Sequence, residues 1–395
     1  MITNPGFSFT GLSGKHEIVP TTDTDLPIWG IGYEKTIRCY ETGDLVQVYT
    51  NGPGHNYLDT SPAMEFIAIS LDDEEAMIEF CDKYGMTSSQ RQEANFRNNY
   101  IFNDIDKNTY SKEAPFGRKQ EIMWVGELKR EFASMRLLVD LNEAIEKNNA
   151  VRIIEILTFF CFDLNRLCFE GTHWPTETAR FNHLFHLFAE SKGYDMKKGM
   201  RSLLYNDLIR SFFDLIDANY EIEQQYASHG QPYHHPYIEV HHSMMWQHII
   251  SIFEWLLPQI SIESISPYGE VVFKPDIQSV DINPLLEEDN HFINTAKSLL
   301  VDIFRERLHR VSPELQFNHG TLPETSWRIP SLVEAMYMEL FFRLTPTGTI
   351  RKCANPTCPN YFQWSSSRKT RKYCCPSCAE LMAKRMERER KRKSK

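Results

Sequence analysis

The sequence predicts a mainly α protein of the α+β class, with small β-hairpins and a C-terminal finger of the zinc-ribbon or treble-clef type. Long stretches between residues 72 and 344 repeat apolar residues at helical spacing. Short apolar runs near the N-terminus and around residue 266 are separated by turn residues, as in hairpins. Five of the nine cysteines lie between Cys353 and Cys378, which indicates a small metal-bound module.

The N-terminal region is expected to contain the first β structure. Residues 1–35 are rich in Gly, Pro and Thr and show little periodicity. Residues 36–40 and 45–50 alternate in character around the turn-forming residues 41–44, which predicts a hairpin. Residues 65–70 are predicted to add a strand.

The remainder of the body is predicted to be helical. Residues 151–169 are apolar on almost every side, which is typical of a helix in the centre of a core. Residues 261–265 and 270–274 flank Ser-Pro-Tyr-Gly and form a second predicted hairpin. The predicted helices cover residues 72–84, 119–147, 151–169, 178–191, 196–218, 241–257, 292–310 and 331–344.

The cysteines near the C-terminus predict one structural zinc ion. Zinc takes four ligands in a tetrahedron, and thiolates suit it well. Cys353 and Cys358 are spaced C-x4-C, and Cys374 and Cys378 are spaced C-x3-C. A disulfide is disfavoured, since nothing marks the chain as secreted. We therefore expect these four cysteines to hold Zn²⁺.

Cys375 is an alternative to Cys374 as the third ligand. Cys375 and Cys378 are spaced C-x2-C, which also suits zinc. Tyr373 and Cys374 are predicted to end a strand, and Pro376 suits the first turn of a helix. Because this arrangement lets Cys378 face the metal from that turn, we favour Cys374, but the sequence leaves the choice open.

Basic residues surround the predicted zinc site and fill the helix that follows it, at residues 376–393. Residues 351–395 carry 14 Lys and Arg against 3 Asp and Glu, a net charge of +11, so that residues 1–350 carry −21 of the total of −10. A cationic helix anchored by zinc suits a phosphate backbone, and we expect nucleic acid as the partner, DNA rather than RNA. The candidate contacts are Arg368, Lys369, Arg371, Lys372, Lys384, Arg385, Arg388, Lys391 and Arg392.

The finger resembles the CGNR-type zinc finger. That finger closes many bacterial proteins with a helical N-terminal domain that are regarded as transcription regulators. The resemblance implies a DNA-binding regulator, although Ala379-Glu380-Leu381 stands where the family has Gly-Asn-Arg. It is carried by the C-x4-C pair, Tyr361-Phe362, Ser365-Ser366-Ser367-Arg368, Arg371-Lys372-Tyr373-Cys374 and Ala383-Lys384-Arg385.

Two other function classes are weighed against a regulator. Arg166 precedes His173, and Arg180 precedes His186, at spacings that resemble the Arg/His pair of compact helical ribonucleases of the HEPN class. That resemblance implies an RNA-cutting toxin or defence effector, with the finger as an RNA clamp. A protein-interaction module with a purely structural zinc is the third class. Chance Arg/His pairs at this spacing are common in a helical protein that contains many histidines, so we favour the regulator.

The chain is expected to be cytoplasmic, with no membrane partner. Its first residues lack a basic start followed by an apolar run, and no stretch of 18 apolar residues occurs. We divide it into a β-containing segment (1–70), a helical body (71–345) and the finger (346–395). The cationic tail could dock on the acidic body, or on that of a second copy to give a homo-oligomer.

Overall fold

The computed structural model describes two compact units. Unit 1 is formed by Met1–Leu26, Tyr33–Val139 and Arg310–Lys395, and unit 2 by Pro27–Gly32 and Asp140–His309. The sequence-based boundaries at residues 70 and 345 stay a prediction. The described residues are 7–20, 35–50, 62–85, 122–163, 176–193, 205–229, 235, 237, 243–287, 291–316, 324–329, 331–344, 349–358, 361–364 and 371–393.

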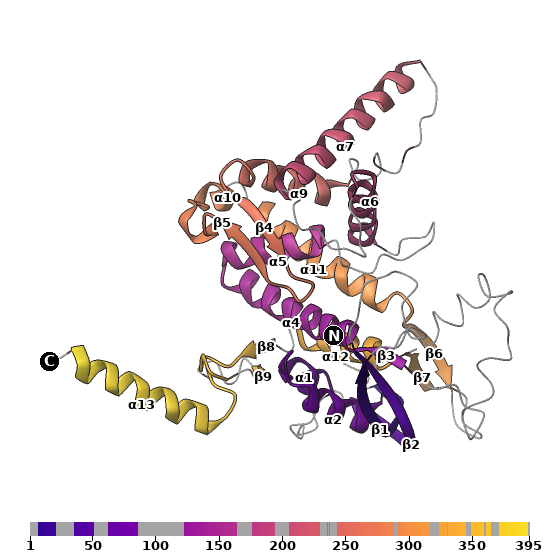
Figure 1. The fold of residues 1–395 in the computed structure, drawn as a ribbon, viewed down its shortest axis with the longest axis vertical. Helices are drawn as coiled ribbons and strands as arrows, with labels where there is room; N and C mark the ends of the chain where they lie inside the picture. Colours follow the sequence, from indigo (N-terminus) through magenta and orange to yellow (C-terminus); the bar gives the residue numbers. More distant parts are fainter. Residues whose placement is uncertain are drawn as a thin grey trace. The chain divides into compact units, whose positions relative to one another are not determined.

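The protein is mainly helical, with short strands in hairpins and one small sheet, which confirms the predicted fold class (Figure 1). The sheet belongs to unit 1 and has the order β1-β2-β3. β1 (Phe7–Pro20) pairs antiparallel with β2 (Lys35–Thr50), and β3 (Ile122–Trp124) pairs with the start of β2. A salt bridge of 2.8 Å joins Lys35 of β2 to Glu74 of α2.

Three local predictions near the N-terminus and in unit 1 were wrong or incomplete. The hairpin within residues 36–50 is instead one strand, because β1 supplies a partner along its whole length. Residues 65–70 lie largely in a helix, α1 (Pro62–Ala68), whose first position is a proline, as helix starts favour. The sequence did not predict the hairpin of β6 (Ser312–Gln316) and β7 (Glu324–Arg328).

Helices form the core of unit 1. Phe66 of α1 lies 3.8 Å from Phe132 and 5.0 Å from Phe80, between ring centroids. The buried carboxylate of Glu339 accepts a hydrogen bond from the backbone N–H of Ala63, at 3.2 Å. It therefore caps α1 from a distant part of the chain. The helices that form this core are α1, α2 (Glu74–Tyr84), the first part of α4 (Val125–Glu146) and α12 (Leu332–Leu344).

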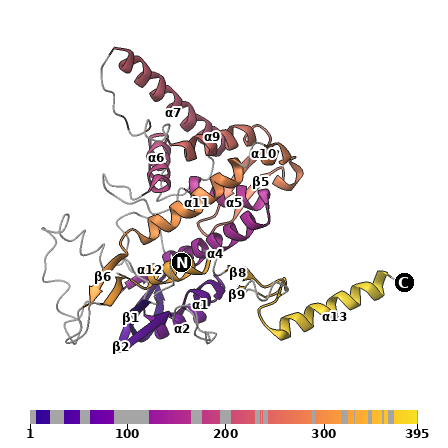
Figure 2. The same cartoon turned by 180° about the vertical axis from the view of Figure 1, so that it is seen from behind.

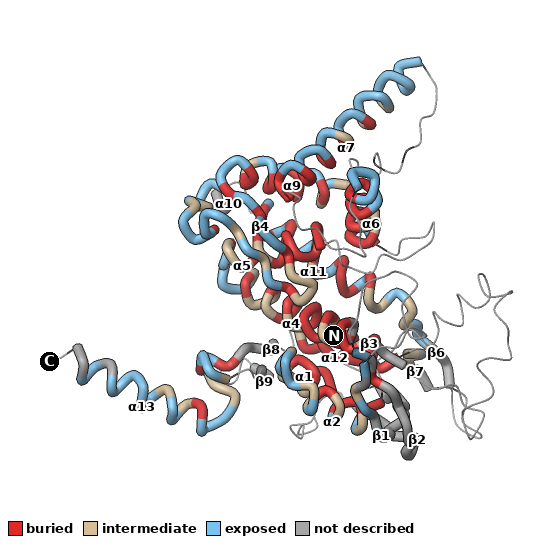
Figure 3. The backbone as a smooth tube through the Cα atoms, in the orientation of Figure 1, coloured by how far each residue is buried: buried red, intermediate tan, exposed pale blue. Residues whose placement is uncertain are grey.

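Unit 2 is built around the buried helix α5, as its apolar sequence predicts (Figure 3). Phe162 at the end of α5 contacts the rings of Phe185 and Phe253, and Phe181 stacks on Trp246 at 3.8 Å. The elements are α5 (Ala150–Phe162), α6 (Glu177–Ser191), α7 (Tyr205–Ser228), α9 (Met244–Leu256), the predicted hairpin β4 (Ser261–Ile265) and β5 (Val271–Lys274), η2 (Ile277–Ser279), α10 (Asn283–Glu287) and α11 (His291–Leu308).

Buried polar groups hold the helices of unit 2 in place. Asp302 of α11 accepts hydrogen bonds from the backbone N–H of Thr178, at 2.7 Å, and from its hydroxyl, which caps α6. The Asn206 amide of α7 donates to the carbonyls of Leu257 and Ile260. The second half of α7 extends beyond the other helices of this unit (Figures 1 and 2).

The finger follows α12 in the chain. Its strands β8 (Thr349–Lys352) and β9 (Tyr361–Trp364) pair antiparallel, and helix α13 spans Pro376–Lys393, the range predicted from the sequence. β8 contacts α12, and β9 contacts α1. Among the described helices, none has both the length and the apolar character that a membrane span requires.

Candidate metal centre

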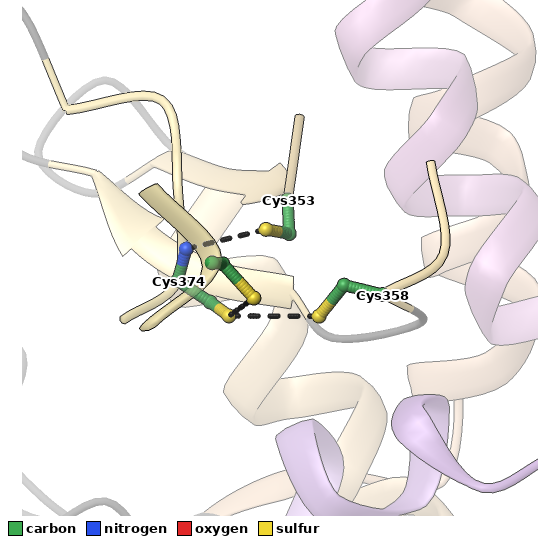
Figure 4. Close-up of side chains that lie close together, drawn as sticks. Cys353, Cys358 and Cys374 are labelled. Carbon is green, nitrogen blue, oxygen red and sulfur yellow. Dashed lines mark hydrogen bonds between the residues drawn. The ribbon is translucent and has the colours of Figure 1, made fainter. Parts of the chain in front are cut away.

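The structure brings together the four cysteines that the sequence predicts as ligands. Cys353 and Cys358 come from the loop after β8, Cys374 precedes α13, and Cys378 lies in its first turn. Figure 4 shows the sulfurs of Cys353, Cys358 and Cys374 pointing toward one another. The four Sγ atoms lie within 4.8 Å of one another, so the loop and the helix start form one site.

The spacing of the sulfurs fits a structural zinc ion. A tetrahedral Zn²⁺ with bonds of about 2.3 Å holds its sulfurs about 3.8 Å apart. The Sγ of Cys374 lies 3.6 Å from that of Cys358 and 3.7 Å from that of Cys378. Cys353 and Cys378 are buried, and Cys358 and Cys374 are half-buried. All four positions of the tetrahedron are supplied by the protein, which is typical of a structural site.

Asn355 organises the first knuckle, the turn between Cys353 and Cys358, and it was not among the residues predicted from the sequence. Its side chain is buried, and its amide donates to the Sγ of Cys378 at 3.6 Å. Its side-chain oxygen accepts from the N–H of Thr357 at 3.3 Å and from the Thr357 hydroxyl at 3.0 Å. Asparagine is favoured in such turns because its side chain can bond to the backbone two residues on, and that preference was a usable signal.

The second knuckle is the segment that carries Cys374 and Cys378. The residues before it, up to Tyr373 and Cys374, were predicted as a strand, and that prediction was wrong. Residues 371–375 contain no strand, and residues 373–375 form bends. The guanidinium of Arg371 donates to the carbonyls of Tyr373, at 3.1 Å, and Cys374. The carbonyl of Lys372 instead accepts from Ala354 at 2.9 Å, which joins the two knuckles. Arg371, predicted to contact nucleic acid, thus also holds the metal loop.

Burial and hydrogen bonds shift the pKa values of the thiols in this site. Burial raises the pKa of the Cys353 thiol, but hydrogen bonds from the backbone N–H groups of Cys374 and Asn355 outweigh it and lower the pKa overall. Burial and the neighbouring Cys358 thiol raise the pKa of Cys374. Crowded thiols thus resist losing every proton unless a cation joins them, as a metal site requires.

Cys375 is the cysteine that the tetrahedron leaves out. Its thiol is exposed, and its Sγ lies 3.8 Å from that of Cys374. A hydrogen bond from the backbone N–H of Cys378 lowers the pKa of Cys375. The group whose four sulfurs converge contains Cys374, which favours Cys374 over Cys375 as the third ligand.

Helix α13 carries many basic residues, and two of its lysines form ion pairs within the helix. Lys384 lies 2.9 Å from Glu380, and Lys391 lies 2.7 Å from Glu387, both as i,i+4 ion pairs. Nearly all side chains described between residues 380 and 391 are exposed, and Ala379 and Met382 are half-buried (Figure 3). Arg368 and Lys369 lie outside the described residues, as does the side chain of Arg392.

The structure gives little support to catalysis by the Arg/His pairs of the body. Arg166 and His173 lie outside the described residues. Arg180 is half-buried on α6, and His186 is buried, with its Nδ1 3.9 Å from a carboxylate oxygen of Glu190. Catalysis by either pair stays a hypothesis.

Comparison with known proteins adds no relative. No protein-family model matches the sequence, and no curated protein or solved structure matches it either. The resemblance of the finger to the CGNR type therefore stays a prediction that rests on the residues quoted for it.

Proposed function

We propose that the protein binds nucleic acid through the finger, as a cytoplasmic DNA-binding regulator. The observation that carries the proposal is the exposure of α13, a cationic helix whose first turn holds a zinc ligand. Zinc fixes the start of the helix, and its 18 residues extend about 27 Å from there. An exposed, anchored helix of this kind presents its charges without first having to fold.

The arginine stripe is the face of α13 that we assign to phosphate contact. Arg385 and Arg388 lie three residues apart on one side of the helix, and both are exposed. Lys384 and Lys391 lie on the neighbouring stripe, where Glu380 and Glu387 offset their charge. The arginines therefore supply a larger share of the favourable contact with phosphates.

A rigid exposed helix favours double-stranded DNA over RNA. The major groove of B-DNA is wide enough to admit an α-helix, whereas that of A-form RNA is deep and narrow. The net charge of −21 on residues 1–350 opposes phosphate contact by the body, which leaves sensing or recruitment as its role. A regulator needs both DNA contact and sensing or recruitment. In this proposal the basic finger contacts DNA, and the acidic body carries out the sensing or recruitment.

The test measures binding of a DNA duplex by the zinc-loaded full chain across a salt series. A double variant, Arg385→Ala with Arg388→Ala, should weaken binding on all sequences and flatten the salt slope by about 2. The matched control is Lys384→Ala with Lys391→Ala, which changes the net charge equally. Because those lysines are already paired, the control should have the smaller effect.

Two outcomes would overturn the proposal. If both double variants bind DNA as the unchanged protein does, α13 is not the contact surface. If the zinc-loaded chain binds neither DNA nor RNA, the finger is a structural element and a protein-interaction module is the better reading. Preference for single-stranded or folded RNA at equal salt would shift the proposal to the RNA-cutting class.

A further inference from the structure

The metal centre contains one more cysteine than zinc needs. Cys353, Cys358, Cys374 and Cys378 complete the tetrahedron, and the fifth sulfur, Cys375, lies beside it. Cys375 is exposed, whereas two of the four ligands are buried and two are half-buried. A hydroperoxide approaching from solvent therefore meets the Cys375 sulfur before any ligand sulfur.

Cys375 also has a partner one helical turn away. Its carbonyl accepts a hydrogen bond from the N–H of Ala379, at 3.3 Å, so Cys375 is the cap residue before Pro376. Cys378 is the third residue of the helix. The segment Cys-Pro-Ser-Cys thus places an exposed thiol at the start of the helix and a buried one in its first turn.

We propose that Cys375 is a site of oxidation by hydroperoxides, and that it forms a reversible disulfide with Cys378 which releases the zinc ion. The inference rests on the metal centre and is independent of nucleic-acid binding. Its substrate class is hydrogen peroxide and small organic hydroperoxides.

The reaction balances in two steps. The Cys375 sulfur attacks the peroxide, an S–O bond forms, the O–O bond breaks, and the thiol proton leaves with the alcohol or water. Cys378 then attacks the resulting sulfenic acid, an S–S bond forms, and hydroxide leaves and takes up a proton as water. The two sulfurs together lose two electrons, and the peroxide gains them.

Backbone geometry selects Cys378 rather than Cys374 as the resolving thiol. A disulfide needs Cα atoms roughly 4.4 to 6.8 Å apart. Adjacent residues are about 3.8 Å apart across a trans peptide, which is too short for a bond between Cys374 and Cys375. Residues three apart on an α-helix are about 5 Å apart, which fits Cys375 and Cys378.

Loss of Cys378 from the tetrahedron removes the metal. Three thiolates remain, and the buried ligand that links the helix to the loop is gone. Because metal binding and folding of a small zinc site are coupled, the finger loses its anchor while the disulfide persists. A dithiol reductant and zinc together reverse the change.

The experiment follows zinc release from the zinc-loaded full chain, with a chromogenic chelator, during addition of hydrogen peroxide. The unchanged protein should release its zinc, and peptide mapping should find the Cys375–Cys378 disulfide. Cys375→Ser keeps all four ligands, so it should still bind one zinc and release it about tenfold more slowly. Ser377→Ala, an exposed neighbour, is the matched control and should behave as the unchanged protein.

Three results would overturn the inference. One is release of zinc from Cys375→Ser as fast as from the unchanged protein. Another is a first disulfide that peptide mapping places elsewhere, for example between Cys358 and Cys374. A Cys375→Ser chain that no longer binds zinc would show instead that Cys375 is a ligand.

Discussion

The side-chain amide of Asn355 donates a hydrogen bond to the Sγ of Cys378, at 3.6 Å, and so joins the first knuckle to the first turn of α13. A thiolate that accepts this bond carries its negative charge more easily and keeps its orientation toward the metal. The same side chain accepts two hydrogen bonds from Thr357. One buried residue therefore sets both the shape of the loop and the position of a ligand.

Replacement of Asn355 should weaken zinc binding without removing a ligand. Loss of an outer-shell partner lowers metal affinity by roughly 10- to 100-fold, and we expect Asn355→Ala to fall in that range. Competition against a chelator of known affinity measures the change. Thr357→Val, which removes the hydroxyl and keeps the backbone hydrogen bond, should cost less. Equal affinities for Asn355→Ala and the unchanged protein would contradict this role.

Removal of zinc should unfold α13. A short helix of high charge has few apolar contacts, so its stability depends on the anchor at Cys378. Treatment of the full chain with a strong chelator should reduce the far-ultraviolet helical signal by a fraction that matches a segment of 18 residues. Cys353→Ser should give the same loss before any chelator is added. A helical signal that zinc does not affect would argue that α13 folds alone.

Asp302 should make the stability of the protein depend on pH. Burial raises the pKa of this carboxyl above its ordinary value, although hydrogen bonds from Thr178 oppose the shift. The folded state thus holds the proton more tightly than the unfolded state, so this stabilising contribution is greatest below the ordinary pKa and is lost as pH rises through the folded pKa.

Two substitutions separate the charge of Asp302 from its hydrogen bonds. Asp302→Asn keeps an acceptor for Thr178 but cannot ionise. The free energy of unfolding of this variant should therefore rise relative to that of the unchanged protein as pH rises from 4 to 7. Asp302→Ala leaves the buried N–H of Thr178 without this acceptor and should be about 2 kcal/mol less stable than Asp302→Asn at every pH. Urea unfolding at several pH values measures both. Parallel pH profiles for Asp302→Asn and the unchanged protein would rule out the charge effect.

Glu339 should be among the costliest residues to truncate in unit 1. Its carboxylate lies 2.7 Å from Arg343 and caps α1 through Ala63, and both ionised side chains are nearly buried. Removing one partner of a buried ion pair costs roughly 3 to 5 kcal/mol, which we expect for Glu339→Ala. Lys147→Ala, which breaks an exposed pair with Glu143, should change the free energy of unfolding by less than about 0.5 kcal/mol. Similar costs for the two variants would contradict the structural assignment.

The sequence predicted the helices and the ligands because their signals are local. Helical periodicity and a cap residue lie within one segment, as in α13, where Pro376 opens the helix at the predicted residue. The spacing of the cysteines is likewise a local signal, because two close pairs separated by a short segment are typical of zinc ligands. Three of the five finger cysteines could therefore be assigned as ligands before the structure was known, and the structure favours Cys374 over Cys375 as the other ligand.

What the sequence could not predict depends on distant partners. β2 is a single strand because β1 pairs with it, and residues 7–20 show too little periodicity to reveal that partner. α1 is short, and Glu339, far along the chain, caps it. Asn355 was visible as a turn former, but its contact with Cys378 needs both knuckles to be folded.

The insertion of unit 2 between the two halves of unit 1 has a consequence for synthesis of the chain. Ala63 and Glu339 are separated by 276 positions. At about 5 to 20 residues per second, a ribosome needs roughly 14 to 55 seconds to make that interval. The sheet and first helices thus emerge long before α12, whereas all of unit 2 can emerge and fold in between. α12, which is made after residues 140–309 of unit 2, therefore completes a core whose first helices are made before them.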